Sequence, residues 1–353
     1  MKNLFLLFLL LSATCPAKEY YVDANAPEGG DGSAKAPFRT IQQAADVMRT
    51  GDVCLIAEGT YRETITPARS GIREAPITYK PRNKDDRVVI SGLEKVPASS
   101  WEKVSGKLFR ARIQMDLDHE NQLFLGEKML LNARWPNSGD DPLKPSLSVM
   151  DEGTTPVMIV DRELPDLDWT GARVWVHAPA YWADWTSPVT GFEKGQLHIE
   201  NLAPFPGPVQ HVATGGADYF IYNCMAALDT ANEWYYDQAE QWLYLCRPDG
   251  KLPSEPCFVK RRMNAFKLDD RSFTGLVDLQ IFGATITTSE ASSNLTFEGL
   301  RILHPYHSTE ANRYYGNQMD KGVLIHGSNC EIRNCEIACS SGCGLVLGGR
   351  YNF

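Results

Sequence analysis

The segment GVLIHG at residues 322–327 recurs as GLVLGG at residues 344–349, which is an offset of 22 residues. A second segment, SNLTF at 293–297, recurs as SNCEI at 328–332 with an offset of 35 residues, so 13 additional residues form a loop between these copies. Glycine and asparagine tolerate the positive φ angles of tight corners. Each coil of a solenoid buries its inward residues only against the coils above and below it. The repeats therefore predict short parallel strands wound into a stacked spiral of β-coils.

The N-terminal part of the chain contains similar apolar runs with no helical pattern between them, at 53–57, 77–79 and 88–90. One helix is predicted from Pro37 to Gly51, where Thr40 and Gln43 have the spacing of a capping box and Gly51 is a natural stop. The single apolar stripe of such a helix must lie across something. Because the first coil otherwise exposes unpaired backbone, we expect the helix, at residues 40–50, to cover that end.

The middle of the chain differs in composition. All eight tryptophans lie between Trp101 and Trp242, in strand-like pieces separated by proline, glycine and aspartate, which predicts an inserted β-rich domain. The predicted organisation is a signal peptide, a cap helix with the first coils, the inserted domain and further coils, at 1–17, 18–100, 101–260 and 261–353 respectively. The sequence stops at Phe353 within another copy of the repeat, so we expect a fold truncated at its C-terminus.

The first residues have the pattern of an export signal. Lys2 precedes the apolar run 4–11, which as a helix spans about 12 Å, far less than the roughly 30 Å of a bilayer core. This pattern predicts a signal peptide cleaved at Ala17, and lipidation of Cys15 is the second interpretation. The protein is therefore expected to be secreted or periplasmic, and a surface lipoprotein is the less favoured alternative.

Charge and hydropathy exclude two classes of partner. The formal net charge of −9 gives no basic footprint for nucleic acid. No stretch after the signal reaches 18 apolar residues, so no membrane span is expected. We expect a monomer that acts on a polysaccharide or oligosaccharide.

Four cysteines cluster near the C-terminus, at Cys330, Cys335, Cys339 and Cys343. Their spacings of five, four and four do not match the paired Cys-x2-Cys of a zinc site. Export permits disulfides. We favour cysteines that stack as small core residues, with a disulfide second and a metal site third.

Several motifs resemble one family. The segments YYVD at 20–23, APFRTIQQAA at 36–45 and GTYRE at 59–63 resemble the opening of secreted bacterial right-handed parallel β-helix proteins. ARWPN at 133–137 and EWYYD at 233–237 resemble the inserted domain of the carbohydrate-active members. The resemblance implies an all-β fold, a right-handed parallel β-helix with an N-terminal capping helix, and a glycan substrate. The same scaffold carries glycoside hydrolases, polysaccharide lyases and epimerases, so it does not decide the reaction.

A glycoside hydrolase, the favoured reading, needs two carboxylates beside the scissile bond. The loop 304–321 holds the candidate catalytic residues, namely Asp320, Glu310 and His307. Because an aromatic face suits the apolar face of a pyranose, the candidate substrate-binding residues include aromatic side chains: Tyr314, Tyr315, Arg313, His304, Trp182 and Trp185. Trp175, in an alternating strand, is expected in the core. In the resembling hydrolases the catalytic acids lie on later coils, beyond Phe353, so no catalytic residue is carried over.

A polysaccharide lyase acting on uronate-containing glycans is the alternative. It needs a base and a cation that neutralises the enolate-like charge, and Lys321, Arg313 and Tyr315 could supply part of that machinery. No cluster of acidic or amide ligands is spaced for Ca²⁺, so we expect no metal or cofactor, with Ca²⁺ reserved for the lyase. A non-catalytic β-helix that binds glycan or serves as a structural element is the third possibility.

Overall fold

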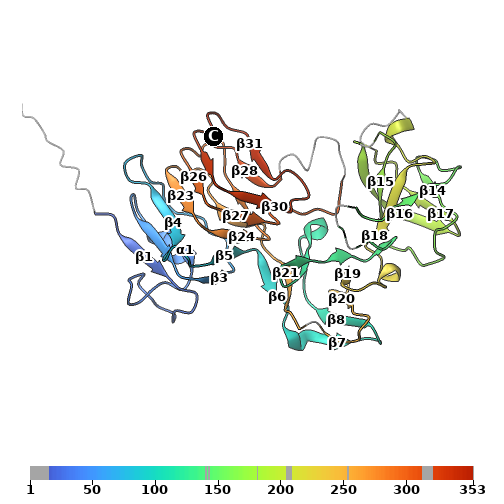
Figure 1. Ribbon diagram of the computed structural model, residues 1–353, viewed down its shortest axis with the longest axis horizontal. Helices are drawn as coiled ribbons and strands as arrows, with labels where there is room; N and C mark the ends of the chain where they lie inside the picture. Colours follow the sequence, from blue (N-terminus) through green and yellow to red (C-terminus); the bar gives the residue numbers. More distant parts are fainter. Residues whose placement is uncertain are drawn as a thin grey trace, which may run out of the picture.

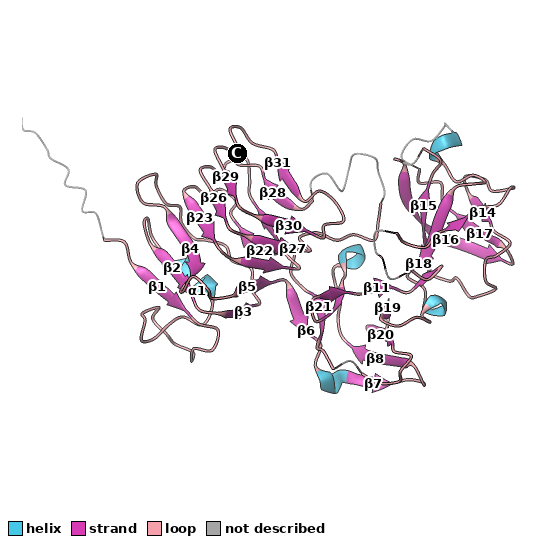
Figure 2. Cartoon of the chain, in the orientation of Figure 1, coloured by secondary structure: helices cyan, strands magenta, loops and turns pink. Residues whose placement is uncertain are grey.

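The computed structural model describes residues 16–139, 141, 144–180, 182–203, 209–252, 254–311 and 321–352. It is almost entirely β-structure (Figures 1 and 2). Apart from Pro16 and Ala17, the predicted signal peptide, with Cys15, lies outside the described residues. No helix in the described part of the chain is long and apolar enough to cross a membrane.

Three parallel sheets form one part of the molecule, which we call the stacked body. The first contains β1 (Glu19–Val22), β2 (Val53–Ile56), β4 (Ile77–Pro81), β23 (Thr274–Val277), β26 (Thr296–Glu298) and β29 (Glu331–Arg333). The second contains β3 (Gly59–Tyr61), β5 (Val88–Ser91), β24 (Gln280–Phe282), β27 (Arg301–Leu303) and β30 (Glu336–Ala338). The third contains β22 (Asn264–Lys267), β25 (Thr285–Thr287), β28 (Val323–Ile325) and β31 (Leu345–Leu347). From β23 onward the chain visits the three sheets in turn and then repeats (Figure 1).

The strand register confirms both repeat offsets. Val323 pairs with Leu345, 22 residues on, and Thr296 pairs with Glu331, 35 residues on. Inward side chains from all three sheets form one apolar core between the sheets. The parallel strands are therefore stacked as the repeats predict, and the 13 additional residues fall between β27 and β28.

Helix α1 (Ile41–Val47) packs on the first strands of the stacked body through its buried face. Thr40 caps it, and the reciprocal contact from Gln43 completes the predicted capping box. The Glu63 carboxylate also accepts the backbone N–H groups of Ile41 and Gln42, each at 2.9 Å. The helix ends before the predicted stop at Gly51: the buried Met48 leaves the helical conformation, with a φ of −56° and a ψ of 144°.

Between Leu93 and Lys260 the pairing changes from parallel to almost wholly antiparallel. One sheet contains β6 (Leu93–Lys95), β9 (Leu123–Leu125), β10 (Lys128–Met129) and β21 (Cys257–Lys260). A second contains β7 (Trp101–Lys103), β8 (Leu108–Arg112), β11 (Leu131–Asn132), β19 (Glu233–Asp237) and β20 (Trp242–Cys246). A third contains β12 (Arg134–Trp135), β13 (Ser148–Val149), β14 (Met158–Val160), β15 (Arg173–His177), β16 (Asp184–Glu193), β17 (Gln196–Ile199) and β18 (Asp218–Tyr222). Short 3-10 helices occur at Ala98–Ser100, Asp118–Glu120, Val209–His211 and Met225–Ala227.

The chain leaves the stacked body and returns to it at one point. The carbonyl oxygen of Gly92 accepts the backbone N–H groups of Arg261 and Arg262, at 2.8 and 3.0 Å. A Cβ at Gly92 would lie 2.3 Å from the carbonyl oxygen of Gly283, so only glycine fits there. On either side of this junction the stacking is continuous, since β4 pairs directly with β23 and β5 with β24.

The clustered cysteines differ in their burial. Cys330 is buried in the core of the stacked body, as expected, whereas Cys339 is exposed. Cys335 and Cys343 are half-buried, and all eight described cysteines are free thiols. The expectation of a buried stack is therefore wrong for Cys339, which takes a φ of +60° at a corner of the coil.

Candidate functional site

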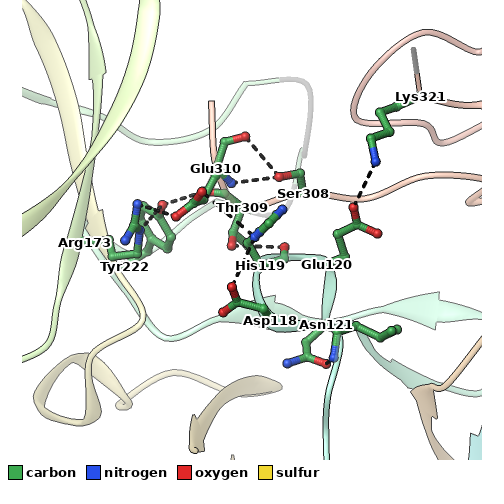
Figure 3. Close-up of polar contacts among 11 residues, drawn as sticks. Asp118, His119, Glu120, Asn121, Arg173, Tyr222, Ser308, Thr309, Glu310 and Lys321 are labelled. Atoms are coloured by element: carbon green, nitrogen blue, oxygen red, sulfur yellow. Dashed lines mark hydrogen bonds and ion pairs between the residues drawn. The ribbon is translucent and has the colours of Figure 1, made fainter. Parts of the chain in front are cut away.

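The segment 304–311, which follows β27, crosses from the stacked body to the antiparallel sheets (Figure 3). The Thr309 backbone N–H donates to the His119 carbonyl oxygen at 2.9 Å, and the Tyr222 hydroxyl donates to the Thr309 carbonyl oxygen at 2.5 Å. Further along, the Ala311 backbone N–H donates to the Thr186 hydroxyl at 3.2 Å. The segment is thus held from two sides, which fixes the position of its side chains.

Glu310 lies where these parts meet. One carboxylate oxygen is 2.6 Å from Nη2 of Arg173, and the other is 3.9 Å from Nδ1 of His119 (Figure 3). The side chains of Glu310 and Arg173 are 31% and 23% exposed, so the pair is partly shielded yet reachable. Arg173 also donates from Nε to the Tyr222 hydroxyl at 3.2 Å, which orients its guanidinium. Glu310 is therefore a positioned carboxylate whose charge is balanced by arginine.

Two cavities border Glu310. One has a volume of about 360 Å³ and is also lined by Trp175, Asp184 and His307. The other has a volume of about 240 Å³ and is also lined by Arg173 and His119. Among the described residues that line the larger cavity, Glu310 and Asp184 are the carboxylates. Two acidic groups therefore face one space.

Aromatic side chains form one wall of the larger cavity. Trp175 and Phe220, which are register partners on β15 and β18, stack with ring centroids 5.2 Å apart and planes 29° apart. The Arg134 guanidinium covers Phe220 at 3.9 Å, and Trp175 donates from its indole N–H to Asp184 at 3.1 Å. Such a flat aromatic wall beside polar groups suits the apolar face and hydroxyl groups of a sugar ring.

Lys260, His304 and His307 form a cluster of basic side chains at the segment 304–311. Lys260 is fully buried, and its ammonium group has no hydrogen-bond partner among the described residues. Burial lowers the pKa of Lys260 to about 8. Burial, together with the charge of Lys260, lowers the pKa of His304 to about 4 and that of His307 to about 3. Both imidazoles are therefore neutral near pH 7.

This cluster predicts a pH-dependent stability. Between about pH 6.5, where an unfolded histidine titrates, and the lowered pKa values of about 4 for His304 and about 3 for His307, the unfolded chain binds more protons than the folded one. Above about pH 6.5 both histidines are neutral in the folded and the unfolded chain, so they do not oppose folding. As the pH falls, the unfolded chain takes up protons that the folded chain does not, and the free energy of unfolding decreases. The midpoint of urea unfolding should therefore decrease from pH 7 to pH 4, and His307→Gln should flatten this decrease. His198→Gln, at an exposed histidine, should not. Equal slopes for wild type and His307→Gln would contradict the assignment.

The structure brings together only part of the predicted site. Glu310 and His307 both line the larger cavity. His304 instead packs edge-on against Phe124 and Phe282, at centroid distances of 5.1 and 5.4 Å, and is not among the residues that line the described cavities. Asp320, Arg313, Tyr314 and Tyr315 lie outside the described residues.

The structure contradicts the predicted placement of two tryptophans. Trp185 is fully buried, so the prediction that it stacks on a sugar is wrong. Trp175 lines the cavity, so its placement in the core is also wrong. Trp182 is 49% exposed and contacts the His211 ring at 4.6 Å, but it is not among the residues that line the described cavities.

The partners of Glu310 were missed by the sequence analysis. Arg173 and His119, which contact the Glu310 carboxylate, and Tyr222, which contacts Thr309 and Arg173, come from three separate elements far from Glu310 in the chain. The one available signal was the alternation in RVWVH at 173–177, which places Arg173, Trp175 and His177 on one face of a strand. No group of three or more metal-ligating His, Cys, Asp or Glu side chains occurs among the described residues.

Comparisons with known proteins support the fold. No family model matches the sequence. Over 82 residues, 23% of this chain, it is 37% identical to the uncharacterized protein YwoF of Bacillus subtilis (strain 168), and the match spans only 17% of that protein's length. A solved structure described as a glycoside hydrolase is 16% identical, with a TM-score of 0.70 over 94% of this chain and 67% of that chain. The structure of XylC with xylose is 17% identical, with a TM-score of 0.43 over 95% of this chain and 52% of that chain. The chain therefore shares its fold with a glycoside hydrolase.

Proposed function

We propose that this protein is an exported glycoside hydrolase built on a right-handed parallel β-helix, with an inserted domain over 101–260. The observation that carries the proposal is the position of Glu310, a carboxylate paired with Arg173 at the edge of a 360 Å³ cavity that has an aromatic wall. The shared fold with a glycoside hydrolase is consistent with this chemistry. A polysaccharide or oligosaccharide is the proposed substrate.

The two carboxylates of the cavity divide the work of hydrolysis. One carboxylic acid gives a proton to the leaving oxygen as the glycosidic bond breaks, while the other carboxylate acts on the anomeric carbon or on the attacking water. We assign the second role to Glu310, because Arg173 balances its negative charge in the site. The proton donor is then Asp184, the other carboxylate that lines the cavity.

A polysaccharide lyase is the second candidate, and one observation favours it. The imidazole of His307 lines the same cavity and is the candidate base for the proton α to a uronate carboxylate. Arg134, whose pKa is lowered by burial to about 10, remains charged there and could face that carboxylate. This reaction cleaves the same linkage by elimination: the proton leaves C5 of the uronate, the bond between C4 and the glycosidic oxygen breaks, a C4–C5 double bond forms and no water is added.

A panel of plant and algal polysaccharides, incubated with the purified full chain in isotope-labelled water, separates these reactions. The proposal expects soluble sugars whose new reducing ends carry one labelled oxygen. Unlabelled products with a new near-ultraviolet absorbance would overturn hydrolysis in favour of elimination. Retention of the protein on immobilised polysaccharide without any product would overturn both reactions in favour of a binding protein.

A further inference from the structure

The outer face of the second parallel sheet presents aligned side chains. Successive residues of a strand point to opposite faces, so Ile281 and Ile302 enter the core while Gln280 and Arg301 face outward. Gln280 and Arg301 are register partners on adjacent coils. Two residues further along, Phe282 and Leu303 form a second outward pair in the same register. A polar row and an apolar row thus run side by side across the coils.

A third cavity, of about 140 Å³, lies on this face. It is bordered by the turn between β9 and β10, at Gly126 and Glu127, and by Phe258 of β21. The floor is apolar and includes Val89, Phe282 and Leu303. The β9–β10 hairpin also borders the 360 Å³ cavity through Met129, so one hairpin separates the two spaces.

The cavity is rich in positive charge. Three arginines and one glutamate line it, namely Arg62, Arg87, Arg301 and Glu127, which leaves an excess of two positive charges in a chain whose net charge is −9. Arg87 uses part of its guanidinium on Glu127, at 2.5 Å. Arg301 pairs at 2.9 Å with Glu336, which is not among the residues lining the cavity. Among the described residues, Arg301 donates to Glu336 from Nε alone, so the terminal nitrogens of its guanidinium remain for a ligand in the cavity.

An aromatic ring holds Arg62 in place. Its guanidinium lies over the Phe258 ring, at 5.6 Å from the centroid. Its Nε is buried and has no hydrogen-bond partner among the described residues. A buried donor without a partner is costly, and an arginine fork matches the geometry of a carboxylate or a sulfate. Arg62 is thus oriented by an aromatic ring at the edge of the cavity.

We propose that this cavity binds an acidic sugar residue, whose carboxylate or sulfate ester pairs with Arg62 and Arg301 while the ring lies on the apolar floor. This inference rests on the proposed function for its glycan context and deepens it by naming an acidic glycan as the substrate class. Charge-assisted hydrogen bonds to arginine are about twice as strong as neutral ones, so the acidic group dominates the affinity.

Calorimetric titration of the full chain carrying Glu310→Gln, which is expected to slow cleavage, tests this site with three probes. These are a galacturonate trimer, the uncharged galactose trimer and a sulfated galactose trimer. We expect the galacturonate trimer, the sulfated trimer or both to bind at least about tenfold more tightly than the galactose trimer. Tighter binding of the galacturonate trimer alone identifies a carboxylate as the ligand group, and tighter binding of the sulfated trimer alone identifies a sulfate ester. Tighter binding of both shows that the site accepts either anion. Equal affinity for all three probes would overturn the inference.

Arginine substitutions locate the binding. Arg62→Gln and Arg301→Gln should each weaken binding of the charged probe about tenfold, whereas Arg333→Gln should leave it unchanged. Arg333 is a matched control because it pairs with Glu298 on another sheet and lies outside this cavity. Arg301 is 43% exposed, so its variant should fold even if Arg62→Gln does not. Unchanged binding in Arg301→Gln would overturn the assignment.

The two proposals fail differently. If the unsubstituted protein releases labelled sugar from neutral polysaccharides but binds no charged trimer, the acidic site is wrong and the hydrolase stands. If a charged trimer binds through Arg301 but no polysaccharide is cleaved, the acidic site stands and the hydrolase is wrong.

Discussion

Glu310→Gln is expected to reduce kcat on a polysaccharide that the unsubstituted protein cleaves by about 1,000-fold. The amide keeps the shape of the side chain and can still accept a hydrogen bond from Arg173, so the segment 304–311 should retain its contacts. It cannot act on the anomeric carbon or take up a proton, and loss of such a group typically costs about 10²- to 10⁴-fold. Initial rates of reducing-end formation measure the effect.

Glu298→Gln is the matched control for this variant. Glu298 also pairs with an arginine, Arg333 at 3.2 Å, and its side chain is 38% exposed. It lies on β26, outside both cavities that border Glu310. The control should keep full activity. Comparable losses in the two variants, or full activity in Glu310→Gln, would contradict the assignment of Glu310 as a catalytic residue.

Trp185→Ala is expected to destabilise the folded protein by about 3 to 5 kcal/mol. Trp185 has no exposed surface and packs in an apolar cluster with Trp169 and its register partner Val176. Removing the indole leaves a large cavity that the surrounding sheet cannot collapse to fill. Urea unfolding followed by circular dichroism measures the loss as a shift of the midpoint.

Trp182→Ala provides the comparison. Trp182 is 49% exposed, so its removal should change the free energy of unfolding by no more than about 0.5 kcal/mol. The two substitutions remove the same side chain from positions three residues apart that differ in burial, 49% exposed for Trp182 and 0% for Trp185. A similar shift of the urea midpoint in both variants would show that Trp185 is not in the core.

The stacked body could be predicted from the sequence because its contacts join segments that are close together in the chain. A coil contacts the coils next to it, so the spacing of GVLIHG at 322–327 and GLVLGG at 344–349 is also the register of β28 and β31. The same reasoning found the capping box of Thr40 and Gln43. Its error at the end of α1 arose because burial of Met48 prevails over the stop signal of Gly51.

The site could be predicted only in part because its partners are distant in the chain. Alternation along RVWVH correctly separates Val174 and Val176 from Trp175, but it does not say which face is covered. The valines are fully buried and Trp175 faces the cavity. Because β16 pairs antiparallel with β15, Trp185 opposite Val176 shares the covered face. Such pairing is invisible to a pattern read along a single strand.

The junction at Gly92 has a consequence for how such a molecule can diversify. The chain leaves the stacked body at Gly92 and returns at Arg261 and Arg262, whose backbone N–H groups donate to the Gly92 carbonyl oxygen. The antiparallel segment is therefore an insertion in a continuous stack of parallel strands. A replacement of different length would leave the stacking intact, because β4 pairs directly with β23, but it would have to rebuild the contacts that His119, Thr186 and Tyr222 make with the segment 304–311. Recombination at this point could therefore exchange the antiparallel segment, including the aromatic side chains that line the cavity beside Glu310, while the stacked body stays intact.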